Sequence, residues 1–214
     1  MNDLAWRLMA LGARFSRRVH CVAPQTVRVE DAFRNGDLIL DLGGGGEGVI
    51  GRLRGHQVVA VDIRKDELDE TPAGPIKVVG DARNLPFPDE SFEAATAFFF
   101  LMYVAAADRS AVLTETHRIL APGGTLHIWD VEIPEPGAHS PKTFVVPVRV
   151  SLPSQTLRTG YGVSWRGHEM SAEGIARIAT TVGFTVSSRT RRGRTFRLAL
   201  ARPETGSPTI PPPG

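Results

Sequence analysis

Four consecutive glycines at positions 43–46 restrict the fold more than any other feature of this 214-residue chain. They follow a short apolar run, Leu38-Ile39-Leu40, and precede a segment, 47–53, that reads as a short helix. Glycine lets the backbone turn sharply and approach a ligand without a Cβ in the way. The start of a helix also presents unpaired N–H groups. The sequence therefore predicts a ligand-binding turn between a strand and a helix.

The hydrophobic pattern between residues 38 and 131 alternates between strands and helices. After the run at 38–40, strands are expected over 58–61, 76–79, 94–100 and 126–131, with a helix over 108–120. The apolar runs lack polar alternation, which is typical of parallel strands covered on both faces. This order predicts an α/β fold built on a doubly wound sheet.

The segments on either side depart from this alternation. A chain of this length suits one domain, which we place at 1–202. We expect an N-terminal helical cap over 1–35, made of an amphipathic helix at 3–18 and a second helical segment at 24–33. Five prolines interrupt an insertion at 133–168, within which 144–150 and 157–163 are candidates to pair as extended segments. A helix at 171–182, a hairpin over 184–200 and a disordered tail at 203–214 complete the prediction.

Composition excludes several classes of protein. The single cysteine, Cys21, cannot form an internal disulfide or supply a zinc cluster, so no metal site is expected. No apolar run approaches the roughly 20 residues needed to span a bilayer. Arg7 and Arg14 interrupt the first apolar stretch, so we expect no export signal and a cytoplasmic protein. The excess of arginine between residues 149 and 202 favours a solvated basic face over attraction of an anionic substrate or nucleic acid.

Acidic residues end three successive strands beside the glycine-rich turn. Asp62 is placed to accept hydrogen bonds from the two hydroxyls of a ribose. Gly43, Gly45 and Gly48 also satisfy the dinucleotide pattern G-x-G-x-x-G, which keeps an NAD(P)-dependent oxidoreductase open. Asp41 favours a ligand with an ammonium group over a pyrophosphate, and Asp81 is placed to accept from an adenine amino group. Because open α/β sheets bind ligands at these strand ends, the three acids favour S-adenosylmethionine.

Two further segments strengthen this reading. Residues 85–93 read LPFPDESFE, and residues 117–124 read HRILAPGG. With them, residues 38–131 resemble a class I S-adenosylmethionine-dependent methyltransferase in the kind, order and spacing of their segments, and residues 171–201 resemble it in topology. The resemblance implies a Rossmann-like, doubly wound and mostly parallel sheet of seven strands, the last antiparallel, with helices on both faces. It also implies S-adenosyl-L-methionine as cofactor and S-adenosyl-L-homocysteine as product.

The same resemblance assigns the cofactor residues. They lie at the ends of four strands: Asp41 with Gly43, Gly44 and Gly45 for the methionine part, Asp62 for the ribose, Ile63, Asp81 and Ala82 for the adenine, and the backbone at Ala97 and Phe98 for the amino group and sulfonium. One position departs from the family pattern, because Glu47 stands where a third alternate glycine is frequent. We expect Glu47 to lie favourably at the N-terminus of the following helix, because that end of a helix attracts negative charge.

The residues that act on the acceptor are less defined. Methyl transfer is an in-line displacement, so the protein must align the acceptor and exclude water, and it needs a base only if the acceptor loses a proton. No base is evident, and each polar candidate is equally well an ordinary packing or surface residue: Tyr103, Asp130, His139, Tyr161 and His168. The fourth strand lacks a following Asn-Pro-Pro-Tyr, which disfavours amino-group methylation of the adenine or glutamine type, and no cysteine there supports covalent attack on cytosine.

The acceptor pocket is expected between the N-terminal helix and the 133–168 insertion. Phe144, Tyr161 and Trp165 either form an aromatic wall of this pocket or pack a cap. We expect a small-molecule acceptor, since no nucleic-acid-binding module is present. A non-catalytic cofactor-binding protein, and another reaction of the same cofactor, stay open. His127 is expected inside the sheet, and the oligomeric state is not predicted.

Overall fold

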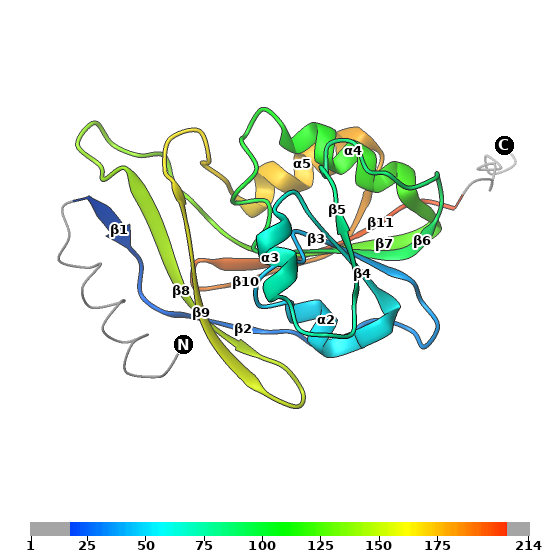
Figure 1. Ribbon diagram of the computed structural model, residues 1–214. Helices are drawn as coiled ribbons and strands as arrows, with labels where there is room; N and C mark the ends of the chain where they lie inside the picture. The colour runs from blue at the N-terminus through cyan, green and yellow to red at the C-terminus, as the bar shows by residue number, and fades with distance from the viewer. Residues whose placement is uncertain (1–17, 205–214) are drawn as a thin grey trace, which may run out of the picture.

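The computed structural model describes residues 18–204 and contains two β-sheets (Figure 1). The larger sheet has seven strands, which are β3 (Ile39–Leu42), β4 (Val58–Asp62), β5 (Ile76–Val79), β6 (Phe92–Phe98), β7 (Leu120–Val131), β10 (Thr185–Arg192) and β11 (Thr195–Ala201). Their order across the sheet is β10-β11-β7-β6-β3-β4-β5. Strands β3 to β7 are parallel, and β11 is antiparallel to both β7 and β10. The predicted seven-stranded, mostly parallel sheet is confirmed.

Helices cover both faces of this sheet. They are α2 (Val49–Arg54), which continues into the 3₁₀ turn η1 (Gly55–Gln57), α3 (Lys65–Glu70), α4 (Arg109–Ile119) and α5 (Ala172–Val182). Helices α4 and α5 pack together above the sheet and α2 lies below it (Figure 1). Ser171 caps α5 as predicted, because its Oγ accepts from Gly174 N at 3.1 Å. None of the helices within residues 18–204 has the length and apolarity needed to cross a bilayer.

The smaller sheet joins the N-terminal segment to the insertion. Its strands are β1 (Val19–Cys21), β2 (Gln25–Arg28), β8 (Thr143–Ser151) and β9 (Thr156–Ser164). Strand β8 lies in the middle, with β1 and β2 parallel to it on one edge and β9 antiparallel on the other. The predicted pairing of the two extended segments is confirmed, in a register that places Val146 opposite Tyr161.

One local prediction is wrong. Residues 24–33 do not form a helical segment, since residues 25–28 form strand β2. Val27 and Val29 are buried while the residue between them is exposed, which is the two-residue period of a strand. The free edge of β8 supplies the hydrogen-bond partners. The helix predicted at 3–18 lies, apart from Arg18, outside the described residues, as does the tail from residue 205, and the division into cap, insertion and tail stays a prediction.

The parallel strands position the site. Ile39 and Leu40 of β3 are fully buried at the centre of the sheet. Because β3 to β7 run in the same direction, their carboxyl ends and the turns that follow meet at one edge of the sheet. Strand β9 of the smaller sheet reaches the same edge, where the ring of Tyr161 lies against Phe99. Two separate parts of the chain therefore meet over the strand ends.

Candidate functional site

A cavity of about 630 Å³ lies over the carboxyl ends of the parallel strands. Nine of the ten residues predicted to bind the cofactor line it: Asp41, Gly43, Gly44, Gly45, Asp62, Ile63, Asp81, Ala82 and Phe98. The three acids thus face one shared cavity. Ala97 does not line it, because it lies inside β6 and is 1% exposed, on the opposite face from Phe98. Phe99 and Phe100, which follow the strand, line the cavity instead.

Asp41 is a buried carboxylate at the floor of the cavity. It is 3% exposed, and its Oδ1 accepts a hydrogen bond from Thr96 Oγ1 at 2.7 Å. Burial raises the pKa of Asp41 to about 7, the hydrogen bond from Thr96 opposes this rise, and the nearby charge of Asp62 adds to it. A cation in the cavity would offset the cost of keeping this carboxylate charged.

The glycine-rich turn approaches this carboxylate closely. The N–H groups of Gly43 and Gly44 both donate to Val61 O, at 2.8 and 3.1 Å, which fixes the turn to β4. A Cβ at Gly45 would lie 2.6 Å from the Cβ of Glu67 and 2.8 Å from Oδ2 of Asp62. No side chain fits at this position, so the backbone itself forms the wall of the cavity.

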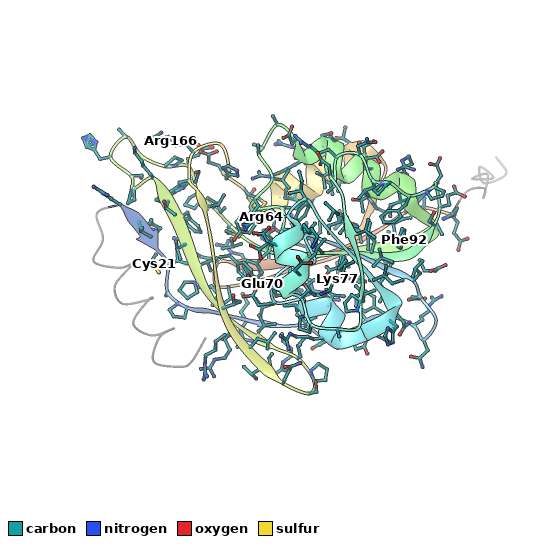
Figure 2. All side chains as sticks on the ribbon, in the orientation of Figure 1. Cys21, Arg64, Glu70, Lys77, Phe92 and Arg166 are labelled. Carbon is teal, nitrogen blue, oxygen red and sulfur yellow. The ribbon has the colours of Figure 1, made fainter. Side chains whose placement is uncertain are left out.

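The acids after β4 and β5 lie in tight turns. Asp62 Oδ1 accepts from Arg64 N at 2.9 Å, and Asp81 Oδ1 accepts from Arg83 N at 2.9 Å. The guanidinium of Arg83 also donates to both oxygens of Asp81 and holds its pKa below the usual range. Arg64, at the start of α3, lines the cavity as well, and Figure 2 shows it at the opposite end of that helix from Glu70. These turns set the carboxylates at the cavity rim.

Strand β9 forms a wall on the far side. The ring of Tyr161 stacks on Phe99 with centroids 4.6 Å apart and planes inclined by 11°. The hydroxyl of Thr159 donates to the carboxylate of Glu47, and Gly162 N donates to the hydroxyl of Tyr103 at 3.2 Å. Strand β9 is therefore held both by the glycine-rich turn and by the loop after β6.

Phe99 has an unusual backbone. Its φ is 49°, in the left-handed region that bulky side chains rarely adopt, and its N–H donates to Trp129 O at 2.7 Å. Strained residues of this kind concentrate at functional sites. The conformation turns the chain out of β6 so that consecutive rings, Phe98, Phe99 and Phe100, all line the cavity.

The predicted polar participants divide into two groups. Tyr103, Tyr161 and His168 line the cavity, whereas Asp130 and His139 do not. Asp130 is fully buried at the end of β7, where it accepts from Met102 N at 3.2 Å and from Val131 N at 2.8 Å. Burial raises the pKa of Asp130 to about 7. It holds the loop after β6 and does not face the cavity.

The predicted aromatic wall is only partly present. Tyr161 faces the cavity, but Phe144 and Trp165 pack against each other, with centroids 5.4 Å apart, and against His20. These two rings therefore serve the alternative role of packing a cap. The register of β8 and β9 puts Phe144 and Tyr161 on the same face of the smaller sheet, so their different surroundings come from their different positions along the strands.

Glu47 does not take the position expected for it. Helix α2 begins at Val49, with Gly48 as its N-cap at a φ of 55°, so Glu47 precedes the helix. Its carboxylate is bound by Thr159 of β9. The cavity also contains charged side chains that the sequence did not reveal: Arg64, Glu67, Arg83 and Asp108. Only their place just after strand ends, or on the next helix, would have suggested them.

Comparison with known proteins places this geometry in a family. Residues 40–128 match the family model described as a methyltransferase domain. A demethylmenaquinone methyltransferase from a Mycobacterium species is 36% identical over 136 residues, which covers 62% of this chain and 55% of that protein. Residues 40–128 therefore form a methyltransferase domain, and the chain is similar to class I S-adenosylmethionine-dependent methyltransferases.

Other methyltransferases agree with this placement. The ubiquinone/menaquinone biosynthesis C-methyltransferase UbiE from a Marinomonas species is 33% identical over 149 residues, covering 63% of this chain and 55% of that protein. This methyltransferase chain thus spans about half the length of these curated relatives. A crystal structure of an S-adenosylmethionine-dependent methyltransferase from Methanosarcina mazei shares the fold, with a TM-score of 0.59 and 19% identity, over 80% of this chain and 95% of that one.

The cofactor of this methyltransferase family is S-adenosylmethionine. The residues present fit it on chemical grounds. The cavity has a buried carboxylate, Asp41, for a cationic group, and further carboxylates at its rim for hydroxyl and amino donors. A Cβ at Gly45 would collide with Glu67 and Asp62, so the turn offers its bare backbone to a ligand. Within residues 18–204, no group of three or more His, Cys, Asp or Glu side chains could hold a metal ion.

Proposed function

We propose that this chain transfers a methyl group from S-adenosylmethionine to a small aromatic acceptor of the quinol type. One observation carries the acceptor class. The ring of Tyr161, stacked on the buried ring of Phe99, gives a planar, apolar lining to the cavity that also contains the three acids. Such a wall suits a planar ring, because aromatic groups prefer stacked or edge-on contacts. The relatives named for methylating demethylmenaquinone and other quinones support the same class.

The cofactor roles in this proposal follow from charge and position. Asp41 receives the ammonium group, Asp62 the ribose hydroxyls and Asp81 the adenine amino group. The backbone of the glycine-rich turn contacts the methionine part, where no side chain intervenes. When bound, the cofactor supplies a methyl group activated by a positively charged sulfur.

The rest of the chain contributes positioning and exclusion of water. Strand β9 closes one side of the cavity through the Thr159–Glu47 and Gly162–Tyr103 hydrogen bonds. The rings of Phe98 and Tyr161, with centroids 6.4 Å apart, line the space beside the end of β6. An acceptor held against these rings is oriented before it reacts, which lowers the entropic barrier.

The arginine-rich C-terminal part also favours a small acceptor over nucleic acid. Several of its arginines are engaged in ion pairs, including Arg189 with Glu173, Arg191 with Glu132 and Arg202 with Glu90. Neutralised side chains of this kind do not present the concentrated positive field that phosphate backbones need. These ion-paired arginines are consistent with the expected basic face that is exposed to solvent.

The test is a methylation assay with the purified full chain. We expect S-adenosylhomocysteine and a methylated product by mass spectrometry when a reduced naphthoquinol is the acceptor, and neither with bulk transfer RNA. Tyr161→Ala is expected to raise KM for the quinol more than it weakens S-adenosylhomocysteine binding. Methylation of RNA with an inert quinol would refute the acceptor class. Tight binding of NAD without binding of S-adenosylhomocysteine would refute the cofactor.

A further inference from the structure

His168 lines the cavity from the segment between β9 and α5. The strand order β7-β6-β3-β4-β5 sets Asp62 and Asp81 at the ends of β4 and β5, on one side of the glycine-rich turn. His168 lies two residues before Met170, which forms a bridge to Ile133 just after β7. Phe99 and Tyr161 line the same cavity as His168.

Three successive carbonyls hold this residue in place. Ala106 N donates to Gly167 O at 3.0 Å. The guanidinium of Arg109 donates to His168 O at 3.0 Å and to Glu169 O at 2.6 Å. Arg109 is itself 3% exposed, and its Nε reaches Leu101 O at 3.4 Å. The His168 backbone is thus anchored to the same loop that carries the aromatic residues.

The imidazole of His168, in contrast, has no partner. Its Nδ1 is buried, and neither ring nitrogen makes a hydrogen bond to any residue in the described part of the chain. Buried polar atoms are nearly always paired, and an unpaired one costs free energy. A side chain whose backbone is held by several hydrogen bonds while its ring has none is placed to bind something that enters the cavity.

Neither of the two tyrosines that line the cavity, nor Asp130, is suited to accept the proton of an acceptor. Burial raises the pKa of the Tyr103 hydroxyl above its usual range, and burial raises the pKa of Tyr161 well above it. Asp130 does not face the cavity and already accepts two backbone N–H groups. His168, in contrast, lines the cavity and has a buried ring nitrogen without a partner among the described residues, and a neutral imidazole can accept a proton.

We propose that His168 is the catalytic base that removes the hydroxyl proton of the acceptor, an inference that rests on the proposed function. The O–H bond of the acceptor breaks, its proton moves to a ring nitrogen of His168, and the electron pair stays on the acceptor. If oxygen is methylated, that pair forms the new bond to the methyl carbon as the bond between methyl and sulfur breaks and its electrons pass to sulfur. If the adjacent ring carbon is methylated, the oxygen pair forms a C=O bond while a ring π pair bonds the methyl carbon. The C–H bonding pair at that carbon then restores the aromatic ring, the oxygen regains its pair, and the ring proton leaves to solvent.

The first test compares His168→Gln with His139→Gln, an exposed histidine of the same insertion. With a reduced naphthoquinol, we expect His168→Gln to lower kcat by about 10²- to 10⁴-fold, the usual contribution of a general base. The rise of kcat with pH that a general base confers should disappear, and imidazole should restore turnover to His168→Ala. S-adenosylhomocysteine affinity should change less than threefold in each variant. A kcat and pH profile equal to wild type would overturn the proposal while leaving the proposed function intact.

The dependence of kcat on pH also depends on other ionisable groups near His168. These groups are Glu169 on its own segment, Asp108 and Arg109 at the start of α4, Asp130 at the end of β7, Tyr103 after β6 and Tyr161 on β9. Asp130→Asn therefore serves as a second comparison. The pH limb should persist in Asp130→Asn if it belongs to His168, and its loss there with retention in His168→Gln would assign it to Asp130.

A second test does not depend on turnover. A nitrophenol reports its own protonation, because the phenolate absorbs at longer wavelength than the phenol. Bound to the wild-type chain with S-adenosylhomocysteine, it should show more phenolate than in solution at the same pH, and this excess should vanish in His168→Gln. Equal spectra in both proteins, or no binding of the phenol, would overturn the proposal. An inactive wild type in the naphthoquinol assay would refute the acceptor class, and the nitrophenol spectra would then decide the role of His168.

Discussion

The hydroxyl of Thr159 donates a hydrogen bond to the carboxylate of Glu47, which joins β9 to the turn beneath it. Glu47 occupies the position where a third alternate glycine is frequent in this family, so the departure has a structural reason. The side chain of Glu47 reaches Thr159 on β9 and fastens the smaller sheet beside the cavity. The bond makes the closure of the site depend on both parts of the chain.

This relationship leads to a first prediction. Thr159→Val removes the hydroxyl and keeps the shape, so affinity for S-adenosylhomocysteine should fall by about 0.5–1.5 kcal/mol, the net value of one hydrogen bond. Titration calorimetry measures it, with Thr156→Val, an exposed position on the same strand, as the control. Equal affinities in the two variants would show that the bond does not hold β9 over the ligand.

A second prediction concerns the ribose contact. Asp62→Ala should weaken S-adenosylhomocysteine binding by about 1–3 kcal/mol, because a charged hydrogen-bond acceptor is lost. Asp69→Ala is the matched control, since Asp69 forms only an exposed ion pair with Lys65 on α3. A folded Asp62→Ala protein with unchanged affinity would remove Asp62 from the cofactor site.

The raised pKa of Asp41 predicts pH-dependent binding. In the ligand-free protein the pKa is about 7 against an ordinary 3.8, so the folded state holds the extra proton between these values. An ammonium group needs the carboxylate form. Affinity should therefore rise with pH up to about 7, by at most about tenfold per unit, and level off above it. Asp41→Asn should bind weakly at every pH, and it should unfold at a higher temperature than ligand-free wild type at pH 8. A flat profile for wild type would contradict the assignment.

The space beside Gly45 gives a steric prediction. Gly45→Ala places a methyl group 2.6 Å from the Cβ of Glu67, so the turn must move and cofactor affinity should fall at least tenfold. Gly137→Ala is the comparison, because a Cβ there meets only Ser140 Oγ at 3.7 Å. Circular dichroism checks that both variants fold before the ligand titration. Normal affinity in Gly45→Ala would mean that the turn adapts without cost.

His127 predicts acid sensitivity. Burial, with a contribution from Arg197, lowers its pKa to about 4 from 6.5, so the folded protein keeps the ring neutral while the unfolded chain takes up a proton. Stability from this residue is therefore present above pH 6.5 and is lost as the pH falls toward 4. His127→Gln should narrow the difference in Tm between pH 7.5 and pH 5. His56→Gln, at an exposed position, should leave that difference unchanged.

The sequence by itself determined the methyltransferase core. The apolar runs without polar alternation predicted β3 to β7, and the glycines placed a turn that only residues without a Cβ can form. The acids after successive strands predicted a shared cavity, because parallel strands bring their carboxyl ends to one edge. These features are local, or follow from the order of strands and helices, and the pattern of residue types along the chain predicts both.

Only the tertiary structure decided how the site is closed. Residues 25–28 form a strand and not a helix because the edge of β8, more than a hundred positions away, offers hydrogen bonds that no local pattern encodes. The same sheet places Tyr161 at the cavity and Phe144, on the same face but at another point along the strands, against His20 and Trp165. The hydrogen bond from Arg109 to His168 O joins residues 59 positions apart, and no local sequence pattern predicts it. Contacts between residues far apart in the sequence depend on which surfaces pack together in the folded chain, and this depends on the packing of the whole domain.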